Sequence, residues 1–545
     1  MNKIFKNNKP NNKLPRVAYF CMEYGLKSSF NIYAGGLGIL AGDYLKGARD
    51  YGYPIVGIGI KWKQGYTCQL IGDDGRPVDV YHNYKYDFLV DTGVKVTVPI
   101  RERNVVCKVW KTEAFGNAPL YLLDTDVPGN EDPWITGHLY GWFGEERIAQ
   151  EMVLGVGGIR ALRALRIPVD VYHFNEGHAV FAGLELIREK MAQGLSFEAA
   201  WSASRRQIVF TTHTPILEGN ETHYLNRLVY MGANLGLSLE QMVKIGDAPF
   251  NMTVAALRLS RIANAVSKLH CETANRMWER VEGRSEIIPI TNAIHLPTWV
   301  DPEILKAAES GKNLWEIHQK NKLKLISFVK ERTGVELKPD KLLIGFSRRA
   351  VPYKRSDLIF RNEKVIAPLF KQGLIQMVFS GKAHPLDDTG KEIVANLVKM
   401  ARKYQGAVVF IENYDLEIAA NLTQGADIWL NNPRRPKEAS GTSGMKAALN
   451  GVLNFSILDG WWPEACIDGV NGWQFGDGYE CDDEGRQDSH DLEALYRVLQ
   501  EKIIPQYYHH REKWVEMMQA SINGAKEPYS VKRMLEDYYQ KMYLE

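Results

Sequence analysis

The chain has 545 residues, of which 45% are hydrophobic and 24% charged, a composition typical of soluble globular proteins and sufficient for at least two large domains. Its 67 basic and 65 acidic residues leave a formal net charge of +2, which offers no broad electrostatic surface for nucleic acid or an anionic membrane and suits a neutral polymer. The six cysteines show no C-x-x-C pair and no metal-ligand spacing, so buried reduced thiols and a cytoplasmic location are expected.

The chain begins with MNKIFKNNKPNNKLPR, which is basic and rich in asparagine. It lacks the apolar centre of a signal peptide, and no later segment has an apolar run long enough to span a bilayer. We expect a short mobile tail at this end.

Short apolar runs alternate with helical patterns in two separate zones, which is typical of doubly wound α/β domains. In the first zone we predict a helix over 40–51 and strands at 17–20, 55–60, 169–174 and 207–212. In the second zone we predict strands at 342–346, 375–379, 408–411 and 427–430. The fold class predicted is α/β, with two Rossmann-like domains. Ligands bind at the carboxyl ends of strands in such sheets, so we expect the two domains to face a central cleft.

The pattern changes near Asn292, where IHLPTWVDPEI carries two prolines and indicates a hinge. We therefore expect a first domain over 1–292 and a second over 293–525. The last segment, 526–545, carries apolar residues at helical spacing and is predicted to be an amphipathic helix.

The run Glu438–Lys446 reads EASGTSGMK and follows a predicted strand and turn. Its small residues expose backbone N–H groups, and the start of the following helix adds partial positive charge, so a phosphate fits there. Lys446 is expected on the first turn, near positive charge and partly desolvated, which lowers the pKa of a lysine and lets it form an imine with a carbonyl. The alternative is a tight turn followed by an exposed lysine, and this motif alone does not decide between them.

Two further motifs each leave two interpretations open. The loop Gly35–Gly38 reads GGLG and lets backbone N–H groups approach a ligand, but it lacks the full G-x-G-x-x-G of a dinucleotide site and also suits a plain turn. The segment RRAVPYKR places four cations, Arg348, Arg349, Lys354 and Arg355, directly after an apolar strand. It is either a solvated basic edge or a site where two phosphates lie close together.

The segment HFNEGH superficially suggests a metal site. His173 and His178 are five residues apart and straddle a turn, so they do not have the geometry of H-E-x-x-H on one helix. We predict no metal there.

The segment EASGTSGMKAALNGVLNFSILDG resembles the cofactor segment of the α-glucan phosphorylases, in which the lysine carries pyridoxal 5′-phosphate. Related segments follow in the family's order: YAGGLGILAGDYLKGARDYGYPIVGIG, HFNEGH, FTTHTP, IGFSRRAVPYKR, FSGKAHP and FIENY. The resemblance implies the B-type glycosyltransferase architecture, pyridoxal 5′-phosphate as cofactor, inorganic phosphate as co-substrate, and glycogen, starch or maltodextrin as substrate. It also implies that the last helix crosses back onto the first domain.

The resemblance implies cofactor and phosphate roles for residues of the second zone. Lys446 would carry the cofactor as an imine. Its phosphate would be bound by Thr442, Ser443 and Arg348, the last at a position where the family often has lysine, and Tyr414 would pack against its ring. The catalytic set would be Lys446 with Arg349 and Lys354, the two cations that hold inorganic phosphate. Val351 stands where some members have histidine, so that contact is missing.

A second set of residues would contact the glucose at the reacting position. His213 would bind its 6-hydroxyl, and Asn292 also contacts it, although Ala293 replaces a common glycine. The remaining contacts are from Gly35, Leu37, Glu438, Ser440 and Gly441. Trp461 and Trp462 could stack on sugars or pack in a core, and we assign them no role.

The activity implied is phosphorolysis of an α-1,4-glucan from its non-reducing end, which gives α-glucose 1-phosphate with retained configuration. The alternative is a nucleotide-sugar glucan synthase of the same architecture, but such enzymes typically have a second glutamate where this chain has Lys446, and a lysine cannot accept hydrogen bonds from a ribose. An inactive glucan-binding module would lack the reactive lysine or the cations, and nothing resembles the fold of an aminotransferase.

The first predicted strand begins near Val17, so we expect the N-terminal regulatory extension of some relatives to be absent and nucleotide effectors to have no influence. A homo-oligomer is compatible with the sequence.

Overall fold

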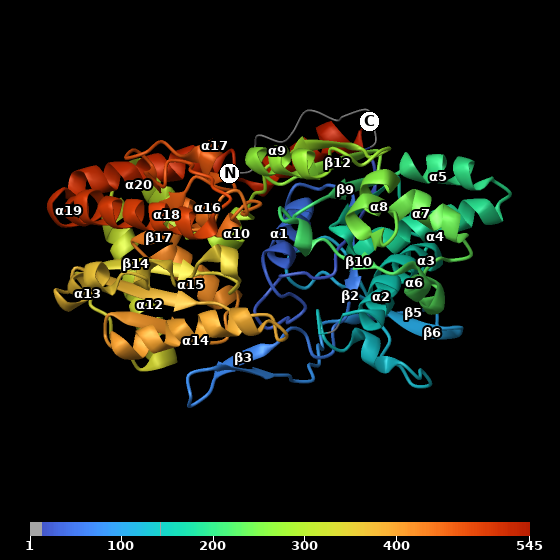
Figure 1. Cartoon of the computed structure of the whole chain (residues 1–545), viewed down its shortest axis with the longest axis horizontal. Coiled ribbons are helices and arrows are strands. Elements are labelled where there is room, and N and C mark those ends of the chain that lie inside the picture. The colour runs from blue at the N-terminus through green and yellow to red at the C-terminus, as the bar shows by residue number, and fades with distance from the viewer. Residues whose placement is uncertain (1–13, 142, 545) are drawn as a thin grey trace.

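The computed structural model of the protein describes residues 14–141 and 143–544 (Figure 1). Most of the expected N-terminal tail therefore lies outside the described residues. The prediction of an α/β fold with parallel sheets is confirmed, because the two largest sheets are built mainly from parallel strands joined by helices. Within the described part of the chain, no helix is both long enough and apolar enough to cross a membrane.

The first half contains a nine-stranded sheet, made of β1 (Val17–Phe20), β2 (Ile55–Ile60), β5 (Val90–Ile100), β6 (Arg103–Thr112), β7 (Leu120–Asp124), β8 (Val171–Asn175), β9 (Ile208–Thr211), β12 (Ile262–Ala265) and β13 (Glu286–Pro289). The strand order is β13-β12-β9-β8-β1-β2-β7-β6-β5. All neighbours are parallel except β7, β6 and β5, which pair antiparallel at one edge. The chain order therefore reverses between β1 and β8.

The second half contains a six-stranded parallel sheet, made of β14 (Leu342–Ser347), β15 (Ile375–Ser380), β16 (Val408–Ile411), β17 (Ile428–Asn431), β18 (Leu453–Ile457) and β19 (Gly472–Phe475). Its order is β16-β15-β14-β17-β18-β19, so the chain order reverses between β14 and β17. β1, β2 and β16 have the bounds predicted from the sequence, and the other predicted strands differ by one or two residues at their ends.

Helices cover both sheets. Those of the first half are α1 (Gly36–Asp50), α2 (Glu145–Met152), α3 (Gly158–Ala164), α4 (Val180–Ala192), α5 (Phe197–Arg205), α6 (Leu225–Met231), α7 (Leu239–Gly246), α8 (Met252–Leu259) and α9 (Lys268–Met277). Those that follow are α10 (Leu296–Trp299), α11 (Pro302–Ser310), α12 (Leu314–Thr333), α13 (Glu363–Lys371), α14 (Asp388–Lys403), α15 (Leu416–Gly425), α16 (Thr442–Leu449), α17 (Trp462–Ala465), α18 (Glu484–Val498), α19 (Ile504–His509), α20 (Arg511–Lys526) and α21 (Val531–Tyr538).

The first helix begins earlier than predicted. We expected it over 40–51, whereas α1 begins at Gly36. The prediction was wrong at this end because it placed the glycines of the loop before the helix. In the structure the extended backbone of Gly35 forms the N-cap, and Gly36 and Gly38 belong to the first turn.

Each sheet has its own hydrophobic core because the strands are apolar and covered on both faces. All four residues of β1 and all six of β14 are buried. The antiparallel edge strand β5 instead alternates exposed and buried residues, as expected where one face meets solvent.

The end of the chain returns to the first half, where Figure 1 places the C-terminus. α21 packs on α1, and Val531 and Leu535 lie so close to Gly47 that a side chain there would clash. Beyond α21 the helix continues as a wider π-helical turn over Tyr539–Tyr543. The hydroxyl of Tyr543 lies 2.6 Å from Nδ1 of His173 and 2.5 Å from the hydroxyl of Tyr44, so the last turn is anchored in the first core.

A small antiparallel hairpin reaches from the first half to the second. It consists of β3 (Cys68–Ile71) and β4 (Pro77–Val80). Gln69 exchanges hydrogen bonds of 3.1 and 2.9 Å with the backbone of Ala383, and the Ile71 N–H donates to Glu412 at 2.7 Å. A second pair, β10 (Thr222–His223) with β11 (Phe250–Asn251), lies wholly in the first half.

Candidate active site

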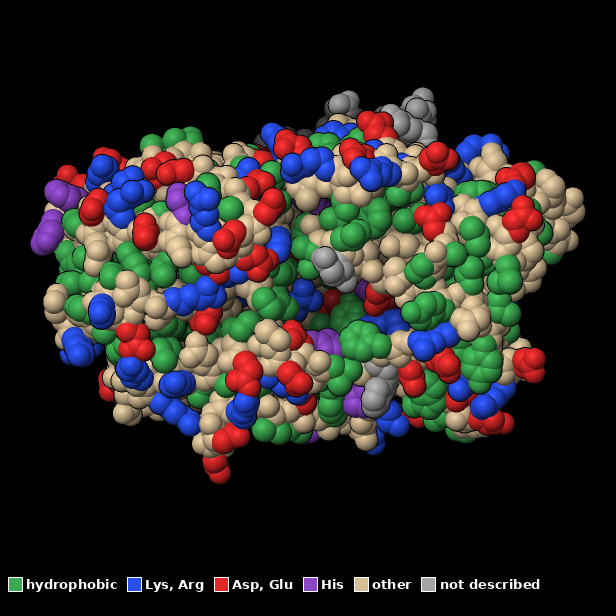
Figure 2. Space-filling model, viewed as in Figure 1, with side chains coloured by type: hydrophobic (Ala, Val, Ile, Leu, Met, Phe, Trp, Pro, Cys, Tyr) green, Lys and Arg blue, Asp and Glu red, His purple; other side chains and the backbone are tan. Residues whose placement is uncertain are grey.

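Four polar segments meet at the positions where strand order reverses. The segments after β1 and β8 carry Glu23 and Glu176, and those after β14 and β17 carry Arg348 and Glu438. Carboxyl ends of parallel strands at such a reversal form a crevice in open α/β sheets. Figure 2 shows the surface hollowed between the two halves, with charged and apolar side chains at the walls. A cavity lined from both halves includes Tyr33, Ala34 and Tyr66 of the first with Lys382 and Tyr414 of the second.

The segment before α16 is shaped by glycines. Gly441 is the N-cap residue of α16 and has φ +87°, a conformation that favours glycine. In the part of the chain that the structure describes, no side chain forms a hydrogen bond to the start of this helix at the N-cap, so the first N–H groups of α16 are available to an anion. Gly444 packs so closely against Trp461 and Asn454 that a Cβ would lie 2.8 and 2.7 Å from their side-chain atoms. Among the described residues, Ser440 Oγ is buried and has no hydrogen-bond partner. These groups fit a phosphate and polar substituents next to it.

Lys446 is buried, with 3% of its surface exposed. It lies on the second turn of α16, so the prediction that it lies on the first turn was wrong by one turn, because the helix begins at Thr442. Burial lowers the pKa of Lys446 to about 8, an effect to which Lys46 adds and which Asp43 opposes. A larger fraction of neutral amine at physiological pH is what attack on an aldehyde requires. The residues present therefore fit a cofactor that carries an aldehyde and a phosphate.

Glu438 lies between two of the predicted cations. Arg348 Nη1 is 2.8 Å from Glu438 Oε2, and the Lys354 ammonium forms an ion pair with the same oxygen. Burial alone would raise the pKa of Glu438, but Arg348 and Lys354 hold it at about 2. Arg348 also lies 3.4 Å from Ser443 Oγ, which places a guanidinium beside the start of α16. The structure thus brings together four residues that the sequence assigned to cofactor, phosphate and sugar.

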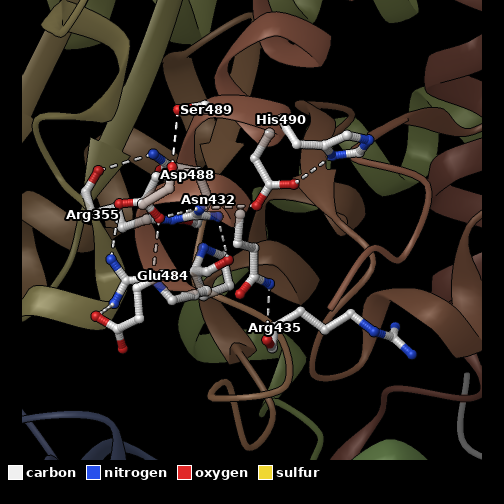
Figure 3. Close-up of polar contacts among 12 residues, drawn as sticks. Arg355, Asn432, Arg435, Glu484, Asp488, Ser489 and His490 are labelled. Atoms are coloured by element: carbon white, nitrogen blue, oxygen red, sulfur yellow. Dashed lines mark hydrogen bonds and ion pairs between the residues drawn. The ribbon is translucent and has the colours of Figure 1, made fainter. Parts of the chain in front are cut away.

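Arg355, the fourth cation of RRAVPYKR, has a different environment. It is fully buried and pairs with Asp488 Oδ1 at 2.9 Å and Asp491 Oδ2 at 2.8 Å. It also donates to the carbonyl oxygens of Asn432 and Pro433 at 2.8 and 2.7 Å, as part of the network in Figure 3. These anionic and carbonyl partners satisfy the guanidinium, so Arg355 ties the segment after β14 to the segment after β17 and to α18.

Arg349 and the glycine loop share a partner in Glu23. Glu23 Oε2 accepts hydrogen bonds from the N–H groups of Ala34 at 2.6 Å and Gly35 at 3.0 Å, and Oε1 accepts from the Tyr140 hydroxyl at 3.0 Å. Burial raises the pKa of Glu23, and these donors oppose the rise, with a smaller contribution from the charge of Arg349, which is exposed. No heavy atom lies within 4 Å of a Cβ built on Gly35, so a ligand can approach that backbone.

His213 and Asn292 lie at other strand ends of the first sheet. His213 Nε2 is 2.6 Å from Asn175 Oδ1 and its backbone N–H donates to Glu176 Oε2 at 2.8 Å. Burial lowers the pKa of His213 to about 3, so the ring is neutral and, with Nε2 donating, Nδ1 is an acceptor. Asn292 is 4% exposed, and its Oδ1 is buried with no partner among the described residues.

Comparison with known proteins identifies the family. Residues 302–466 match a family model described as carbohydrate phosphorylase. Maltodextrin phosphorylase of Thermococcus litoralis is 37% identical over 99% of this chain and 72% of its own length, and glycogen phosphorylase of Aquifex aeolicus is 35% identical over 97% and 86%. The chain belongs to the carbohydrate phosphorylase family. An uncharacterized protein of Methanocaldococcus jannaschii is 37% identical over 97% of this chain and 99% of its own length.

The part that matches the phosphorylase family model contains the cations, Tyr414 and the run Glu438–Lys446, but not Gly35, Leu37, His213 or Asn292. The similarity to full-length phosphorylases covers these as well.

The two histidines of HFNEGH separate in this phosphorylase. His173 is fully buried and lies 2.7 Å from Thr211 Oγ1. His178 lies with Glu151 and Glu221, and ligand atoms of the three are within 4.8 Å of one another. Arg147 Nε is 3.3 Å from Glu221 Oε1, so a guanidinium already supplies positive charge to this cluster. The sequence-based prediction of no metal stays a prediction.

Three aromatic residues differ in their surroundings. Tyr414 is partly exposed and lines the cavity between the halves. Trp461 and Trp462 are 2% and 1% exposed and pack in a core with Met445, so they have no surface on which a sugar could stack.

Sequence reasoning missed several residues that the structure places at this site. Glu23 lies in the segment just after β1, and its position near a strand end was a signal that could have found it. Lys382 in FSGKAHP lies beside the cavity, and burial lowers its pKa to about 8. Asp43 and Trp299 contact the surroundings of Lys446 from α1 and α10, and no local pattern indicates that these helices meet.

Proposed function

We propose that the protein is an α-1,4-glucan phosphorylase that cleaves glycogen or maltodextrin from the non-reducing end and releases α-glucose 1-phosphate with retained configuration. The observation that carries the proposal is the buried Lys446 amine, with its pKa lowered to about 8, one turn behind a helix start that is shaped for a phosphate. Membership of the phosphorylase family supports it, because the relatives are named maltodextrin and glycogen phosphorylases.

The architecture proposed is that of B-type glycosyltransferases: residues 1–292 and 293–525 form two doubly wound domains around a central cleft, and 526–545 return to the first domain. The two separate cores and the reversal of strand order in each sheet support this division. The cavity lined from both halves supports a cleft between them.

Lys446 would hold pyridoxal 5′-phosphate covalently through its amine. Thr442 and Ser443, at the start of α16, would hold its phosphate together with Arg348, and Tyr414 would pack against its ring. When bound, the cofactor supplies a phosphate with a second pKa near 6, which can exchange a proton with a neighbouring phosphate around neutral pH. The amine of Lys446 would thus serve attachment, and proton exchange would involve the phosphate that Thr442, Ser443 and Arg348 would hold.

Arg349 and Lys354 bind the inorganic phosphate. Their positive charge stabilises it and the charge that develops as the glycosidic bond breaks. The phosphate gives a proton to the glycosidic oxygen, the shortened glucan departs, and a phosphate oxygen attacks the anomeric carbon on the face that the leaving group occupied. The new bond therefore has the configuration of the old one.

The glucose at the reacting position is held by uncharged groups and by Glu438. Ser440, Gly441 and Glu438 bind the 3- and 4-hydroxyls, His213 binds the 6-hydroxyl and Asn292 also contacts the ring. Gly35 and Leu37 would contact the glucose through their backbone. The neutral ring of His213 and the unpartnered Oδ1 of Asn292 suit sugar hydroxyls, which both donate and accept hydrogen bonds.

The nucleotide-sugar glucan synthase is not favoured, because Lys446 cannot accept a hydrogen bond from a ribose. With its balanced charge, the protein acts on a neutral glucan and needs neither nucleic acid nor a membrane. We place it in the cytoplasm, and a homo-oligomer is compatible with the described surface.

The test is incubation of the purified protein with maltodextrin and phosphate, with glucose 1-phosphate as the measured product. We expect activity in the wild type, and a loss of at least about 1000-fold in Lys446→Ala and Arg349→Ala. Lys437→Ala is the matched control, since Lys437 precedes Glu438 but pairs with Glu484 near the surface. Full activity in Lys446→Ala would exclude the proposed role of the cofactor.

A further inference from the structure

The amine of Lys446 packs against the indole ring of Trp299. Its Nζ lies over the indole, 3.3 Å from the ring centroid, which is close for a cation–π contact. Trp299 is 1% exposed and belongs to α10, in the segment that joins the two halves, whereas Lys446 belongs to α16 of the second half. The lysine is therefore positioned by a residue more than one hundred positions away in sequence.

The far edge of this indole is bound by a carboxylate from the first half. Trp299 Nε1 lies 2.9 Å from both oxygens of Asp43, a residue of α1 that is 1% exposed. Asp43 Oδ2 also accepts the backbone N–H of His295 at 3.2 Å. A carboxylate at the N–H edge makes the face of an indole more negative and so strengthens its attraction for an ammonium on that face.

Other charges near the lysine act in opposite directions. Asp43 favours the charged form of Lys446, and Lys46, also on α1, disfavours it. Lys46 donates a hydrogen bond to Thr298 Oγ1 at 3.0 Å. The ring of His295 lies between this hydroxyl and Asp50: Nδ1 is 2.7 Å from Thr298 Oγ1, and Nε2 is 2.8 Å from Asp50 Oδ2. Asp43 and Lys46 are buried, and the loss of water around them makes their interactions with the Lys446 amine stronger than on the surface.

We propose that Asp43 acts through Trp299 as a positioning residue for Lys446, holding the amine over the indole and favouring its protonated form until an aldehyde arrives. This inference rests on the proposed function, in which Lys446 anchors an aldehyde cofactor. Because α1 supplies Asp43 and α16 supplies Lys446, attachment of the cofactor depends on contact between the two halves.

The proposal predicts that substitutions of Asp43 and Lys46, both on α1, shift the pH at which Lys446 becomes reactive in opposite directions. Asp43→Asn removes the negative charge and keeps the shape, so the amine of Lys446 becomes reactive at lower pH, by about 1 to 2 pH units. Trp299→Phe keeps a ring face but loses the N–H and shifts reactivity in the same direction. Lys46→Met removes the opposing cation and shifts reactivity to higher pH.

The experiment measures Lys446 directly in the full-length chain stripped of cofactor. Brief reductive methylation with formaldehyde and cyanoborohydride between about pH 6 and 10, read on the Lys446 peptide by mass spectrometry, gives the midpoint of its reactivity. The same samples treated with pyridoxal phosphate and borohydride report cofactor attachment. Asp50→Asn is the matched control, since Asp50 is an exposed α1 carboxylate that contacts His295 but not Trp299.

The proposal is supported if the pH midpoint of Lys446 reactivity falls in Asp43→Asn and Trp299→Phe, rises in Lys46→Met and stays unchanged in Asp50→Asn. Equal midpoints in the wild type and Asp43→Asn overturn it, even when pyridoxal phosphate attaches normally and the proposed function stands. Absence of pyridoxal phosphate on wild-type Lys446 refutes the proposed function, and the methylation midpoints still decide the role of Asp43. Trp299→Phe gives the decision if Asp43→Asn does not fold.

Discussion

At the scale of single residues, the site is governed by buried charges that neutralise one another. Glu438 forms ion pairs with both Arg348 and Lys354, and the three side chains together carry one net positive charge. Asp459 accepts the Glu438 N–H at 2.9 Å, and burial, with the charge of Glu438 next to it, raises the pKa of Asp459 to about 7. A dianionic phosphate placed beside Arg349 would meet a site whose remaining charge is positive.

Glu438→Gln should therefore make stability depend on phosphate. Loss of the carboxylate leaves two buried cations unpaired, which should lower the free energy of unfolding by about 3 to 5 kcal/mol. Phosphate should restore part of this by binding the unpaired cations, whereas chloride should restore less. Thermal unfolding at increasing phosphate concentration measures the effect. Glu484→Gln, which affects a carboxylate half exposed at the surface, is the control, and equal phosphate dependence in both variants would contradict the prediction.

Lys446→Met should reveal the energetic cost of the buried amine. The pKa of Lys446 in the folded chain is about 8, below the usual 10.5, so the unfolded chain binds the proton more tightly and wild-type stability rises between these pH values. Methionine removes this cost, and the cofactor-free variant should be more stable by about 3 kcal/mol at pH 7, with the gain vanishing above about pH 10. Urea unfolding at several pH values checks this. A gain independent of pH would show that the lysine is not the cause.

At the scale of elements, the start of α16 depends on close backbone packing. Gly460 has φ +59° and lies against the carbonyl oxygen of Ser440, which accepts the Trp461 N–H at 2.9 Å. The turn after β18 thereby supports the segment before α16 from behind. This support explains how a segment of small residues keeps one conformation.

Gly460→Ala should lower the free energy of unfolding by about 1 to 3 kcal/mol and should reduce activity, because the new Cβ pushes against Ser440 and Glu438. Gly52→Ala is the matched control: Gly52 has φ +70° but nothing within 4 Å of its Cβ position, so it incurs backbone strain without a clash. Chemical unfolding and the rate of glucose 1-phosphate formation measure both effects. Equal losses in the two variants would contradict a supporting role for Gly460.

The sequence predicted local features well and long-range pairings poorly. Apolar runs gave β1, β2 and β16 with their bounds, because a strand covered on both faces must be continuously apolar. The cations after β14 and the loop before α16 were also foreseen. The sequence did not predict which residues pair with Arg355 and with Glu438, or that Asp43 contacts Trp299. Each of these contacts joins elements whose proximity depends on the completed fold.

At the scale of the whole molecule, the two halves are joined by the segment after β13 and by the returning C-terminal helix. Val531 N–H donates to the Ile294 carbonyl at 2.9 Å, and Ile294 N–H donates to the Tyr529 carbonyl at 3.0 Å, so the two connections pair with each other. α21 then completes the first core. The arrangement predicts that α21 stabilises the first half rather than the second.

Leu535→Ala tests this, since Leu535 is fully buried against α1. The substitution should cost about 2 to 5 kcal/mol and should weaken hydrogen-exchange protection in α1 and β1 before β14 and β15. Lys532→Ala, on the exposed face of α21, should change stability by less than about 0.5 kcal/mol. Protection lost first in the second sheet would contradict the assignment of α21 to the first core.

The central claim is that Lys446 anchors pyridoxal phosphate in a glucan phosphorylase. It is tested most directly by borohydride reduction of the purified protein, followed by mass spectrometry of the peptide that contains Lys446. We predict a phosphopyridoxyl group on Lys446 in every active chain. An active protein in which Lys446 is unmodified would contradict the account.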